Sequence, residues 1–431
     1  MKKFSSYNFL FQNKEKNYIY NSLSNFLAEL DDEAYHILLS AEKGLVIENL
    51  ETYPELIAGK VFISEEEERD EIYNYKITTH IQRYQNRFMT LVIAPTYHCN
   101  FACSYCYETS RPPLYMDETT ENNIVEFVKK IKTLNGLHVT WFGGEPLLNF
   151  EKIRSLTNKF LDLGLNYSAD ITTNGFLLDE EKISFLEELR INSIQITIDG
   201  IGAAHDARRP HVSGVSSFNK ITENLDYFYT KDRATVINIR VNIDKTNEDN
   251  FYQLYTILHE RYPKARISPS FVFTKDTGCQ IASNCIIGKD EKFNFHYGLY
   301  KNYDTPLNIY PQLKSKECIA RHAYSFVVGA NGDLFKCFDH IGNTEYAIGN
   351  INNDSFNSAL YNRYIVGADP LDDPKCIKCK IFPICSGGCP MLRLENEKLG
   401  EDKYDLCVLM KDSEEKFLSL HLEQKSKQSV N

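Results

Sequence analysis

Short apolar runs alternate with longer amphipathic segments between residues 88 and 271. Five segments have helical spacing, and they lie at 118–132, 150–163, 179–189, 216–229 and 248–261. The apolar runs read, in order, FMTLVIAP, LHVTWFGG, ADITTNG, SIQITIDG, ATVINIRVNI and ISPSFVF. Strand alternating with helix is typical of parallel βαβ units, whose chemistry gathers at the carboxyl ends of the strands. We therefore predict an α/β fold with a partial (β/α)6 TIM-type barrel, and an open doubly wound sheet is the alternative.

The segments before and after this array have different patterns. The N-terminal segment mixes strand-like runs near 7–11 and 18–20 with helical spacing near 23–30 and 33–41, which predicts a small α+β domain. The acidic run 65–70 predicts a solvated face or a linker. Residues from 311 onward are rich in turns and cysteines, which predicts a small domain organised around metal. The predicted domains are 1–85, 86–310 and 311–431.

Composition narrows the class of protein. The 431 residues are 42% hydrophobic, which is enough for two or three domains with sizeable cores. The net charge of −11 argues against non-specific nucleic-acid binding, although a local basic patch stays open. No apolar run reaches the ~18 residues of a membrane helix, and the N-terminus lacks the apolar core of a signal peptide. We therefore expect a cytoplasmic protein with no membrane or nucleic-acid partner.

The 12 cysteines are grouped rather than scattered. None occurs in the first 98 residues, three lie at 99–106, two at 279 and 285, and seven between 318 and 407. Thiols stay reduced in the cytoplasm, so grouped cysteines indicate metal ligands or catalytic groups rather than disulfides. Cysteines that only fill a core would occur singly.

Cys99, Cys103 and Cys106 follow the first predicted strand, in the segment TYHCNFACSYCYE. Three thiolates at the spacing Cys-x3-Cys-x2-Cys can hold an iron–sulfur cluster or a zinc ion. A closed structural zinc site needs a fourth ligand, and His98 is poorly placed to turn back beside Cys99. Three cysteines on a four-iron cluster leave one iron open to another ligand.

With Tyr105 before the third cysteine, this segment resembles the signature of the radical SAM superfamily. The resemblance implies a [4Fe–4S] cluster whose open iron is chelated by the amino and carboxylate groups of S-adenosylmethionine (SAM). It also implies that SAM is reductively cleaved to a 5′-deoxyadenosyl radical, which removes a hydrogen atom from a substrate. Tyr105 then belongs to the cofactor-binding residues.

Gly143, Gly144 and Glu145 follow the second predicted strand. Glycines at a strand end let the backbone approach a ligand closely, and a carboxylate there can accept hydrogen bonds from an ammonium group. An ordinary turn explains the same residues. The resemblance assigns them to the superfamily's GGE motif, which binds the amino group of the methionine moiety.

Two more loops resemble the superfamily at the ends of the third and fourth predicted strands. Thr173 and Asn174 lie in the sequence TTNG, and Thr197 lies two residues before Asp-Gly. The resemblance places all three in the cofactor site, with Thr197 at the nucleoside and Arg209 at the methionine carboxylate. Arg208 is adjacent and is the competing choice, and a pair of surface arginines is the alternative.

The seven C-terminal cysteines form the densest group in the chain. Two zinc sites are the physical alternative for such a group. The arrangement resembles the SPASM extension of radical SAM enzymes, which implies two auxiliary [4Fe–4S] clusters and three clusters in all. The implied ligands are Cys376, Cys379, Cys385 and Cys407 for one cluster, and Cys318, Cys337 and Cys389 for the other.

The second auxiliary cluster is one protein ligand short in this assignment. Cys279 or Cys285 would fill the open position. Otherwise the position is open to solvent or to a substrate thiolate. Our hypothesis is that the open iron binds a substrate cysteine or that the cluster accepts the electron left after bond formation.

The resemblance implies an enzyme that oxidatively modifies a ribosomally made peptide and forms a thioether or a carbon–carbon cross-link. Its expected partners are a precursor peptide with a leader and a reductant such as flavodoxin or ferredoxin. Residues 1–85, winged-helix-like in this comparison, would recognise the leader by adding it as a strand. A structural cap on the barrel is the alternative for this segment.

Two other functions stay open. Anaerobic sulfatase-maturing enzymes resemble this chain through both cysteine regions, but they carry a catalytic Asp directly after the cysteine that matches Cys337. Here that position holds Phe338, and Asp339, one residue later, is the candidate catalytic residue. A non-enzymatic iron–sulfur electron-transfer or metal-binding protein is the alternative of a different class.

Overall fold

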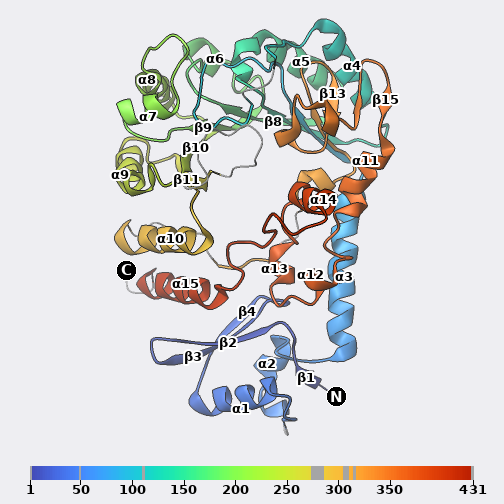
Figure 1. Cartoon of the computed structure of the whole chain (residues 1–431), viewed down its shortest axis with the longest axis vertical. Coiled ribbons are helices and arrows are strands. Elements are labelled where there is room, and N and C mark those ends of the chain that lie inside the picture. The colour runs from blue at the N-terminus through green and yellow to red at the C-terminus, as the bar shows by residue number, and fades with distance from the viewer. Residues whose placement is uncertain are drawn as a thin grey trace. The chain divides into compact units, whose positions relative to one another are not determined.

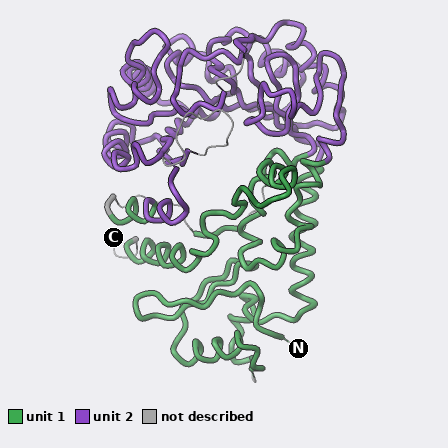
Figure 2. Tube along the Cα trace, in the orientation of Figure 1, with its two compact units in different colours: residues 1–84, 296–322, 363–431 green, residues 85–295, 323–362 purple. Residues whose placement is uncertain are grey.

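The computed structural model describes residues 2–47, 50–108, 112–272, 286–303, 310–313 and 317–428. Cys279 and Cys285, the candidates for the missing cluster ligand, lie outside these residues. The chain forms two compact units, coloured separately in Figure 2. Residues 323–362 belong to the same unit as the predicted strand–helix array, although they lie within the predicted cysteine-rich domain. Unit 1 comprises residues 1–84, 296–322 and 363–431, and unit 2 comprises residues 85–295 and 323–362.

Unit 2 is built on one ten-stranded sheet, in which the six strands of the predicted array are parallel to one another (Figure 1). The order of these six strands in the sheet is their order in the chain. A doubly wound sheet reverses its strand order at a switch point, so the observed order excludes that alternative. The strands are β6 (Phe88–Ile93), β7 (Gly136–Trp141), β8 (Asn166–Thr173), β9 (Ile191–Thr197), β10 (Val236–Ile243) and β11 (Arg266–Phe271).

Helices connect these strands, and four of the five predicted helices are confirmed at nearly their full length. The remaining predicted helix, at 179–189, ends at Ser184. Hydrogen-bonded turns follow it, and Arg190 takes a positive φ of 54° before β9. α7 was not predicted. The helices are α4 (Glu118–Lys129), α5 (Phe150–Leu161), α6 (Glu180–Ser184), α7 (Ala203–Arg208), α8 (Ser217–Tyr229) and α9 (Phe251–Arg261).

Four more strands extend the sheet beyond β6. β12 (Ser325–Val328) pairs in parallel with β6, and β13 (Asp333–Phe335), β14 (Gly349–Asn350) and β15 (Ser355–Phe356) continue in antiparallel pairs.

Helices on a parallel sheet bury its apolar side chains. Fully buried examples lie on five successive strands, namely Leu91, Val139, Ile171, Ile194 and Ile239.

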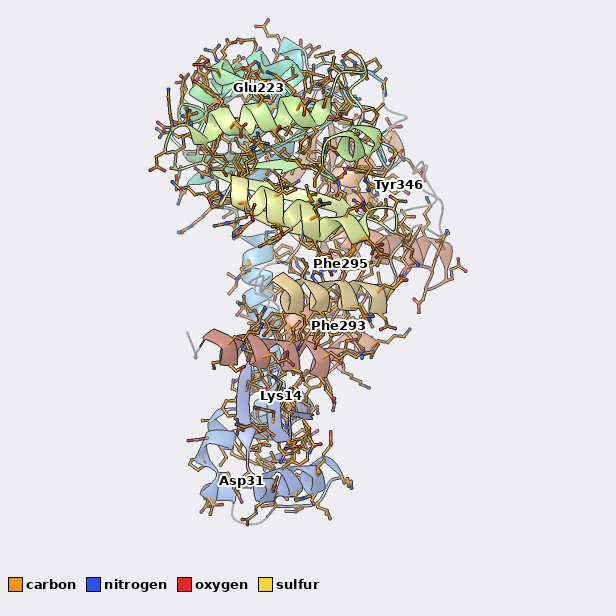
Figure 3. All side chains as sticks on the ribbon, turned by 90° about the vertical axis from the view of Figure 1, so that its left-hand side faces the viewer. Lys14, Asp31, Glu223, Phe293, Phe295 and Tyr346 are labelled. Atoms are coloured by element: carbon orange, nitrogen blue, oxygen red, sulfur yellow. The ribbon has the colours of Figure 1, made fainter. Side chains whose placement is uncertain are left out.

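The first turns of α10 (Lys289–Tyr303) also belong to unit 2. Phe295, labelled in Figure 3, packs against Phe251 of α9 and Phe271 of β11 at ring-centroid distances of 5.1 and 5.4 Å. This aromatic contact anchors α10 to the last strand–helix unit of the array.

Residues 23–30, predicted as helical, form a turn followed by a strand over residues 26–30. The side chains alternate between two faces, because Phe26, Ala28 and Leu30 pack in one hydrophobic cluster and Leu27 packs in another. A period of two therefore describes the segment, and Asn25, at a φ of 60°, makes the tight turn that precedes it. The antiparallel sheet contains β2 (Asn8–Asn13), β3 (Lys16–Asn21) and β4 (Phe26–Leu30).

The acidic run 65–70 is not a linker, because it forms the first turns of the helix α3 (Glu65–Tyr84). Negative charge is favourable at a helix N-terminus, and Glu68 also accepts hydrogen bonds from Ser5 and Ser6. Asp31, labelled in Figure 3, caps α1 by accepting from the Ala34 amide at 2.7 Å. The remaining elements here are α1 (Asp32–Glu42), α2 (Pro54–Ala58), β1 (Lys2–Phe4) and β5 (Phe62–Ser64).

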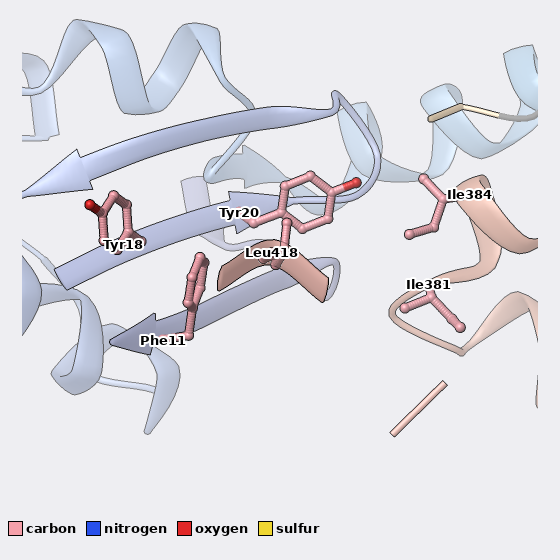
Figure 4. Packing of buried hydrophobic residues seen from close by; sticks show 6 residues of the cluster. All are labelled: Phe11, Tyr18, Tyr20, Ile381, Ile384 and Leu418. Carbon is pink, nitrogen blue, oxygen red and sulfur yellow. The ribbon is translucent and has the colours of Figure 1, made fainter. Parts of the chain in front are cut away.

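The C-terminal part of unit 1 shares a hydrophobic core with the antiparallel sheet (Figure 4). The buried cluster consists of Phe11, Tyr18, Tyr20, Ile381, Ile384 and Leu418. The cysteine-rich segment therefore packs directly on the N-terminal strands. Its helices are α12 (Pro374–Ile377), α13 (Phe382–Cys385), α14 (Pro390–Leu399) and α15 (Glu414–Gln428). None of the helices in the described ranges is long and apolar enough to cross a bilayer.

Candidate functional site

The segment that carries Cys99, Cys103 and Cys106 leaves the carboxyl end of β6, and we call residues 96–106 the cysteine loop. All three cysteines are partly buried. His98 is exposed, and its ring Nδ1 shares a hydrogen bond of 2.8 Å with the Tyr115 hydroxyl. The imidazole is thus engaged away from the three sulfurs.

Gly143 and Gly144, after β7, pack against the start of the cysteine loop. A Cβ on Gly144 would lie 2.3 Å from the His98 carbonyl oxygen, and one on Gly143 would lie 2.5 Å from that of Thr96. The amides of Gly144 and Glu145 donate to these carbonyls of Thr96 and His98 at 3.2 and 2.9 Å. Glycine is needed because backbone meets backbone here. The residues that follow β7 therefore hold the backbone of the cysteine loop in place just before its first cysteine.

The Glu145 carboxylate is fully buried and accepts three hydrogen bonds. Leu147 N and Thr173 Oγ1 donate to Oε1 at 3.0 and 2.7 Å, and Asn174 N donates to Oε2 at 2.7 Å. Burial raises the pKa of Glu145, and the hydrogen bonds from Asn174, Thr173 and Leu147 oppose that rise. Since each carboxylate oxygen accepts about two hydrogen bonds, Oε2 keeps one position for a donor such as an ammonium group.

Asn174 connects the loop after β8 to the cysteine loop. Its Nδ2 donates to Asn100 Oδ1 at 2.7 Å, and its Oδ1 accepts from the Phe176 amide at 3.0 Å. Thr173 Oγ1 accepts from the Gly175 amide at 3.0 Å while donating to the buried carboxylate. Both predicted residues thus hold the site together by their side chains.

Residues 208–212 hold the cysteine loop from another part of the chain. The amides of Ala102 and Ser104 donate to the carbonyls of Pro210 and Arg208 at 2.9 and 3.1 Å. In the opposite direction, the Val212 amide donates to the Asn100 carbonyl of the loop at 2.9 Å. The loop is therefore bonded on one side to the residues after β7 and on the other to those after α7.

Tyr105 lies at the centre of a polar network. Its hydroxyl donates to Asp199 and accepts from Arg209 Nη1 at 2.5 Å and from Asn242 Nδ2 at 3.0 Å. The backbone amide of Asn242 also donates to the Asp199 carboxylate at 2.7 Å. Burial raises the pKa of Asp199, whereas the charge of Arg209 lowers it. The Nε of Arg209 is buried and has no partner among the described residues, so it can donate to an anion.

The two neighbouring arginines have different surroundings. Arg208 Nη2 pairs with Asp244 Oδ2 at 3.0 Å. Arg209 is 8% exposed and lies over the Phe101 ring at 5.7 Å. The alternative of two surface arginines is therefore wrong. Both guanidinium groups lie over the Tyr105 ring and both keep a buried Nε without a partner among the described residues. They differ because Arg209 donates to the Tyr105 hydroxyl, whereas Arg208 pairs with Asp244. Thr197, the last residue of β9, is buried at the same strand end.

Residues 93–258 match the sequence model of the radical SAM superfamily. The chain carries a radical SAM domain. The matched region begins at the end of β6 and contains the cysteine loop, Glu145 and Arg209. The superfamily predicted from the cysteine spacing is confirmed, and the chain is an enzyme of the radical SAM type.

Anaerobic sulfatase-maturating enzymes are among the curated relatives. The serine-type enzyme of Bacteroides thetaiotaomicron is 24% identical over 349 residues, which cover 70% of this chain and 82% of the relative. The cysteine-type enzyme of Clostridium novyi is 24% identical over 367 residues, which cover 77% of this chain and 96% of the relative. The similarity thus extends beyond the radical SAM domain itself.

Two solved structures share the fold. Native anSMEcpe with bound AdoMet superposes with a TM-score of 0.61 at 20% identity and covers 79% of this chain and 100% of its own. Streptococcus suis SuiB bound to S-adenosylmethionine superposes with a TM-score of 0.57 at 15% identity and covers 94% of this chain and 99% of its own. A further SuiB structure is bound to precursor peptide SuiA, with a TM-score of 0.52 at 16% identity.

The residues of the radical SAM domain fit the cluster and the SAM that the family implies. Burial and then the Glu145 carboxylate raise the pKa of the Cys99 thiol to about 12, so its thiolate forms at neutral pH only beside a cation. The open position on Glu145 and the unpartnered Nε of Arg209 suit an ammonium and a carboxylate group. Within the described ranges no group of three or more Cys, His, Asp or Glu side chains is placed to hold one metal ion.

The seven C-terminal cysteines are divided between the two units. Cys337 belongs to unit 2, and the other six belong to unit 1. Cys318 and Cys407 are exposed, and the remaining five are partly buried. Their grouping into two auxiliary clusters stays a prediction.

Phe338 attaches the segment after Cys337 to the radical SAM loops within unit 2. Its ring lies 5.4 Å from that of Phe142, the residue before Gly143. Asp339 follows in a short 3-10 turn, Phe338–His340. The position at which the resemblance to sulfatase-maturing enzymes predicts a catalytic Asp holds a phenyl ring that is 42% exposed.

Two polar residues of the site were missed in the sequence. Asn100 accepts from Asn174, and Asn242 donates to Tyr105. A single asparagine has no diagnostic spacing. The available signal was position. Asn100 follows a candidate cluster ligand, and Asn242 is the second-to-last residue of the parallel strand β10, at the end where such folds place their functional side chains.

Proposed function

We propose that this radical SAM enzyme modifies a ribosomally made peptide and closes a thioether or carbon–carbon cross-link, using two auxiliary clusters. The observation that carries the radical chemistry is the cysteine loop, which backbone hydrogen bonds hold between two loops that each present an open polar group. The proposed cluster ligands there are Cys99, Cys103 and Cys106.

Each cofactor-binding residue has a defined task in this proposal. When bound, SAM and the cluster would supply the radical that removes a hydrogen atom from the peptide. Glu145 accepts from the SAM ammonium group and Arg209 donates to its carboxylate, while Gly143 and Gly144 leave space for the loop backbone. Tyr105 orients Arg209. Thr173 and Asn174 fix the Glu145 carboxylate, and Thr197 lines the nucleoside side.

The N-terminal part of unit 1 supports a peptide substrate. β4 pairs only with β3, so one of its edges is free within the described residues to accept a leader peptide as an added strand. SuiB, which has been solved with a precursor peptide, covers 94% of this chain, whereas anSMEcpe covers 79%. We infer that the N-terminal part of unit 1 accounts for the larger share of this chain that SuiB covers.

Sulfatase maturation, the oxidation of a Cys or Ser to formylglycine, is the second candidate. The curated relatives favour it, because both sulfatase-maturating enzymes align over more than two thirds of this chain. Phe338 argues against it, because a phenyl ring cannot take a proton from the substrate. Asp339 is the carboxylate that would replace the missing Asp.

One experiment separates the two. The anaerobically loaded enzyme is given SAM, a reductant and either the short peptide encoded beside its gene or a sulfatase-derived peptide. A cross-link removes two hydrogen atoms, and a thioether also makes one thiol resistant to alkylation. Formylglycine is trapped by a hydrazine. Modification of the neighbouring peptide without a trappable aldehyde supports our proposal, and formylglycine on the sulfatase peptide alone overturns it.

A further inference from the structure

Arg393, on α14, reaches from its helix to a cysteine that our proposed function assigns to an auxiliary cluster. Its Nη2 donates to Cys376 Sγ at 3.1 Å and to the Gly387 carbonyl at 2.9 Å. Its Nη1 donates to Asp373 Oδ2 at 2.6 Å. The Arg393 side chain is 14% exposed, so these hydrogen bonds are largely shielded from water. One guanidinium thus joins a ligand sulfur, a carboxylate and the backbone between two further cysteines.

That backbone is the segment from Cys385 to Cys389, which has a left-handed conformation. Ser386, Gly387 and Gly388 have φ angles of 59°, 72° and 75°. A Cβ on Gly387 would lie 2.0 Å from Pro370 Cβ, so this position accepts only glycine.

The last glycine of this segment brings it to another assigned ligand. A Cβ on Gly388 would lie 2.0 Å from the carbonyl oxygen of Leu406, the residue before Cys407. The hydrogen bond to the Gly387 carbonyl therefore places Arg393 among residues adjoining Cys385, Cys389 and Cys407. All of them lie in unit 1.

A second arginine adds positive charge at the same segment. Arg321 is 1% exposed, and its Nη1 donates to the Ser386 carbonyl at 3.2 Å. Its Nε and Nη2 have no hydrogen-bond partner among the described residues. Buried guanidinium nitrogens without partners suit an anionic neighbour, and a cluster with thiolate ligands is anionic. The residues present therefore fit an iron–sulfur cluster at this place.

The direction of the effect follows from charge. Reducing a cluster adds one negative charge, and hydrogen bonds to the cluster sulfurs stabilise that charge. Guanidinium remains protonated in proteins, so it supplies this stabilisation at every working pH. Asp373 holds Arg393 in orientation and balances its formal charge, and Asp373 Oδ2 lies 3.4 Å from Cys376 Sγ. The stabilisation therefore comes from the hydrogen bond that Arg393 Nη2 donates to that sulfur.

We propose that Arg393 is a positioning residue that raises the reduction potential of the auxiliary cluster bound by Cys376, Cys379, Cys385 and Cys407. This inference rests on the proposed function. The cluster would take up one electron as the peptide radical closes its bond and releases a proton. Arg393 thus makes that cluster the favourable electron acceptor.

The test is a redox titration followed by electron paramagnetic resonance. The background carries Cys99→Ala, Cys103→Ala and Cys106→Ala, so only auxiliary clusters contribute signals. Arg393→Gln is compared with Arg393→Lys and with the control Arg363→Gln, whose arginine forms an exposed pair with Glu397 at 3.4 Å. Iron and sulfide content are measured on every sample.

Arg393→Gln is expected to bind the same iron and to lower the ratio of reduced to oxidised cluster about tenfold at a fixed solution potential. For a one-electron couple that ratio corresponds to a shift of about 59 mV toward negative values. Arg393→Lys keeps a cation and recovers part of the shift. Arg363→Gln leaves the potential unchanged.

Three results overturn the inference. An unchanged potential in the fully loaded Arg393→Gln variant would contradict it alone and leave the proposed function standing. Loss of iron from both Arg393 variants would show that the residue is a structural brace. Background protein that binds no iron would overturn the auxiliary-cluster assignment itself, together with this inference.

Discussion

Asn174 donates a hydrogen bond of 2.7 Å to the side chain of Asn100, which directly follows the candidate ligand Cys99. The same Asn174 donates from its backbone amide to Glu145 at 2.7 Å. One residue therefore fixes the cysteine loop and the carboxylate proposed to bind SAM. In our proposed function, this connection would fix the position of SAM relative to the cluster.

Asn174→Ala is expected to lower the free energy of unfolding by about 1–3 kcal/mol, because the buried Asn100 carbonyl loses its donor. We expect SAM cleavage to slow about tenfold or more, since small displacements of reacting groups are costly. Urea unfolding and the rate of 5′-deoxyadenosine formation measure the two effects. Asn122→Ala, at an exposed helical position, is the matched control. Equal behaviour of the two variants would contradict the proposed link.

Gly144→Ala is expected to destabilise the radical SAM domain by about 3 kcal/mol, the upper end of overpacking costs. The reason is that the new Cβ meets the His98 carbonyl oxygen, a backbone atom that cannot rotate away. Gly367→Ala is the control, because its nearest neighbour is a side-chain atom at 3.5 Å. Thermal unfolding of both variants checks this. A Gly144→Ala protein as stable as the control would show that the loop is not clamped.

Arg209→Gln is expected to weaken SAM binding about tenfold to a hundredfold, the value of one charge-assisted hydrogen bond. Arg208→Gln is expected to leave SAM affinity nearly unchanged and to lower stability instead, because it leaves the buried Asp244 unpaired. Equilibrium binding of SAM to the iron-loaded protein distinguishes the two. Reversed effects would exchange the roles of the neighbouring arginines.

Asp369 gives unit 1 a predictable acid sensitivity. Burial raises the pKa of Asp369, whereas hydrogen bonds from Arg83 and from the Leu371 amide lower it. The lowering is the larger effect, so the pKa lies below its usual value. Folded Asp369 therefore stays ionised at a lower pH than in the unfolded chain. Its ion pair stabilises the fold above about pH 4 and is lost as the pH falls through the folded pKa.

Asp369→Asn is the corresponding variant. It is expected to cost about 1.5–3 kcal/mol at neutral pH, because Arg83 loses its charged hydrogen bonds to Asp369 but keeps Glu317 as a buried partner. The stability of this variant should also depend less on pH below 4. Urea unfolding between pH 7 and pH 3 measures both, with the exposed Asp372→Asn as control. A wild-type protein whose stability does not fall in that range would refute the assignment.

Patterns that repeat along the chain could be predicted, because they depend on local physics. The six parallel strands follow from apolar runs between helical segments, and the cysteine loop follows from its spacing and its place after the first strand. Residues 23–30 were misjudged because a short apolar run fits both periods, and only pairing with β3 decides between them.

Partners that are distant in the sequence could not be predicted. Arg393 contacts Cys376 from another helix, and Asn242 reaches Tyr105 across more than a hundred residues. Such contacts depend on how loops fold back, for which a single residue leaves no periodic signal. The resemblance favours Arg209 over Arg208, and that choice stays a prediction. The ion pair of Arg208 with Asp244, which distinguishes the surroundings of the two arginines, appears only in the structure.

The central claim is that Cys99, Cys103 and Cys106 hold the cluster that cleaves SAM. Its most direct test is the 5′-deoxyadenosine formed by anaerobically loaded enzyme with SAM and a reductant, compared with the variant in which all three cysteines are alanine. The account predicts stoichiometric or repeated formation by the wild type and none by the variant, which still binds iron at its C-terminal cysteines. No 5′-deoxyadenosine from the fully loaded wild type, or equal amounts from both proteins, would contradict it.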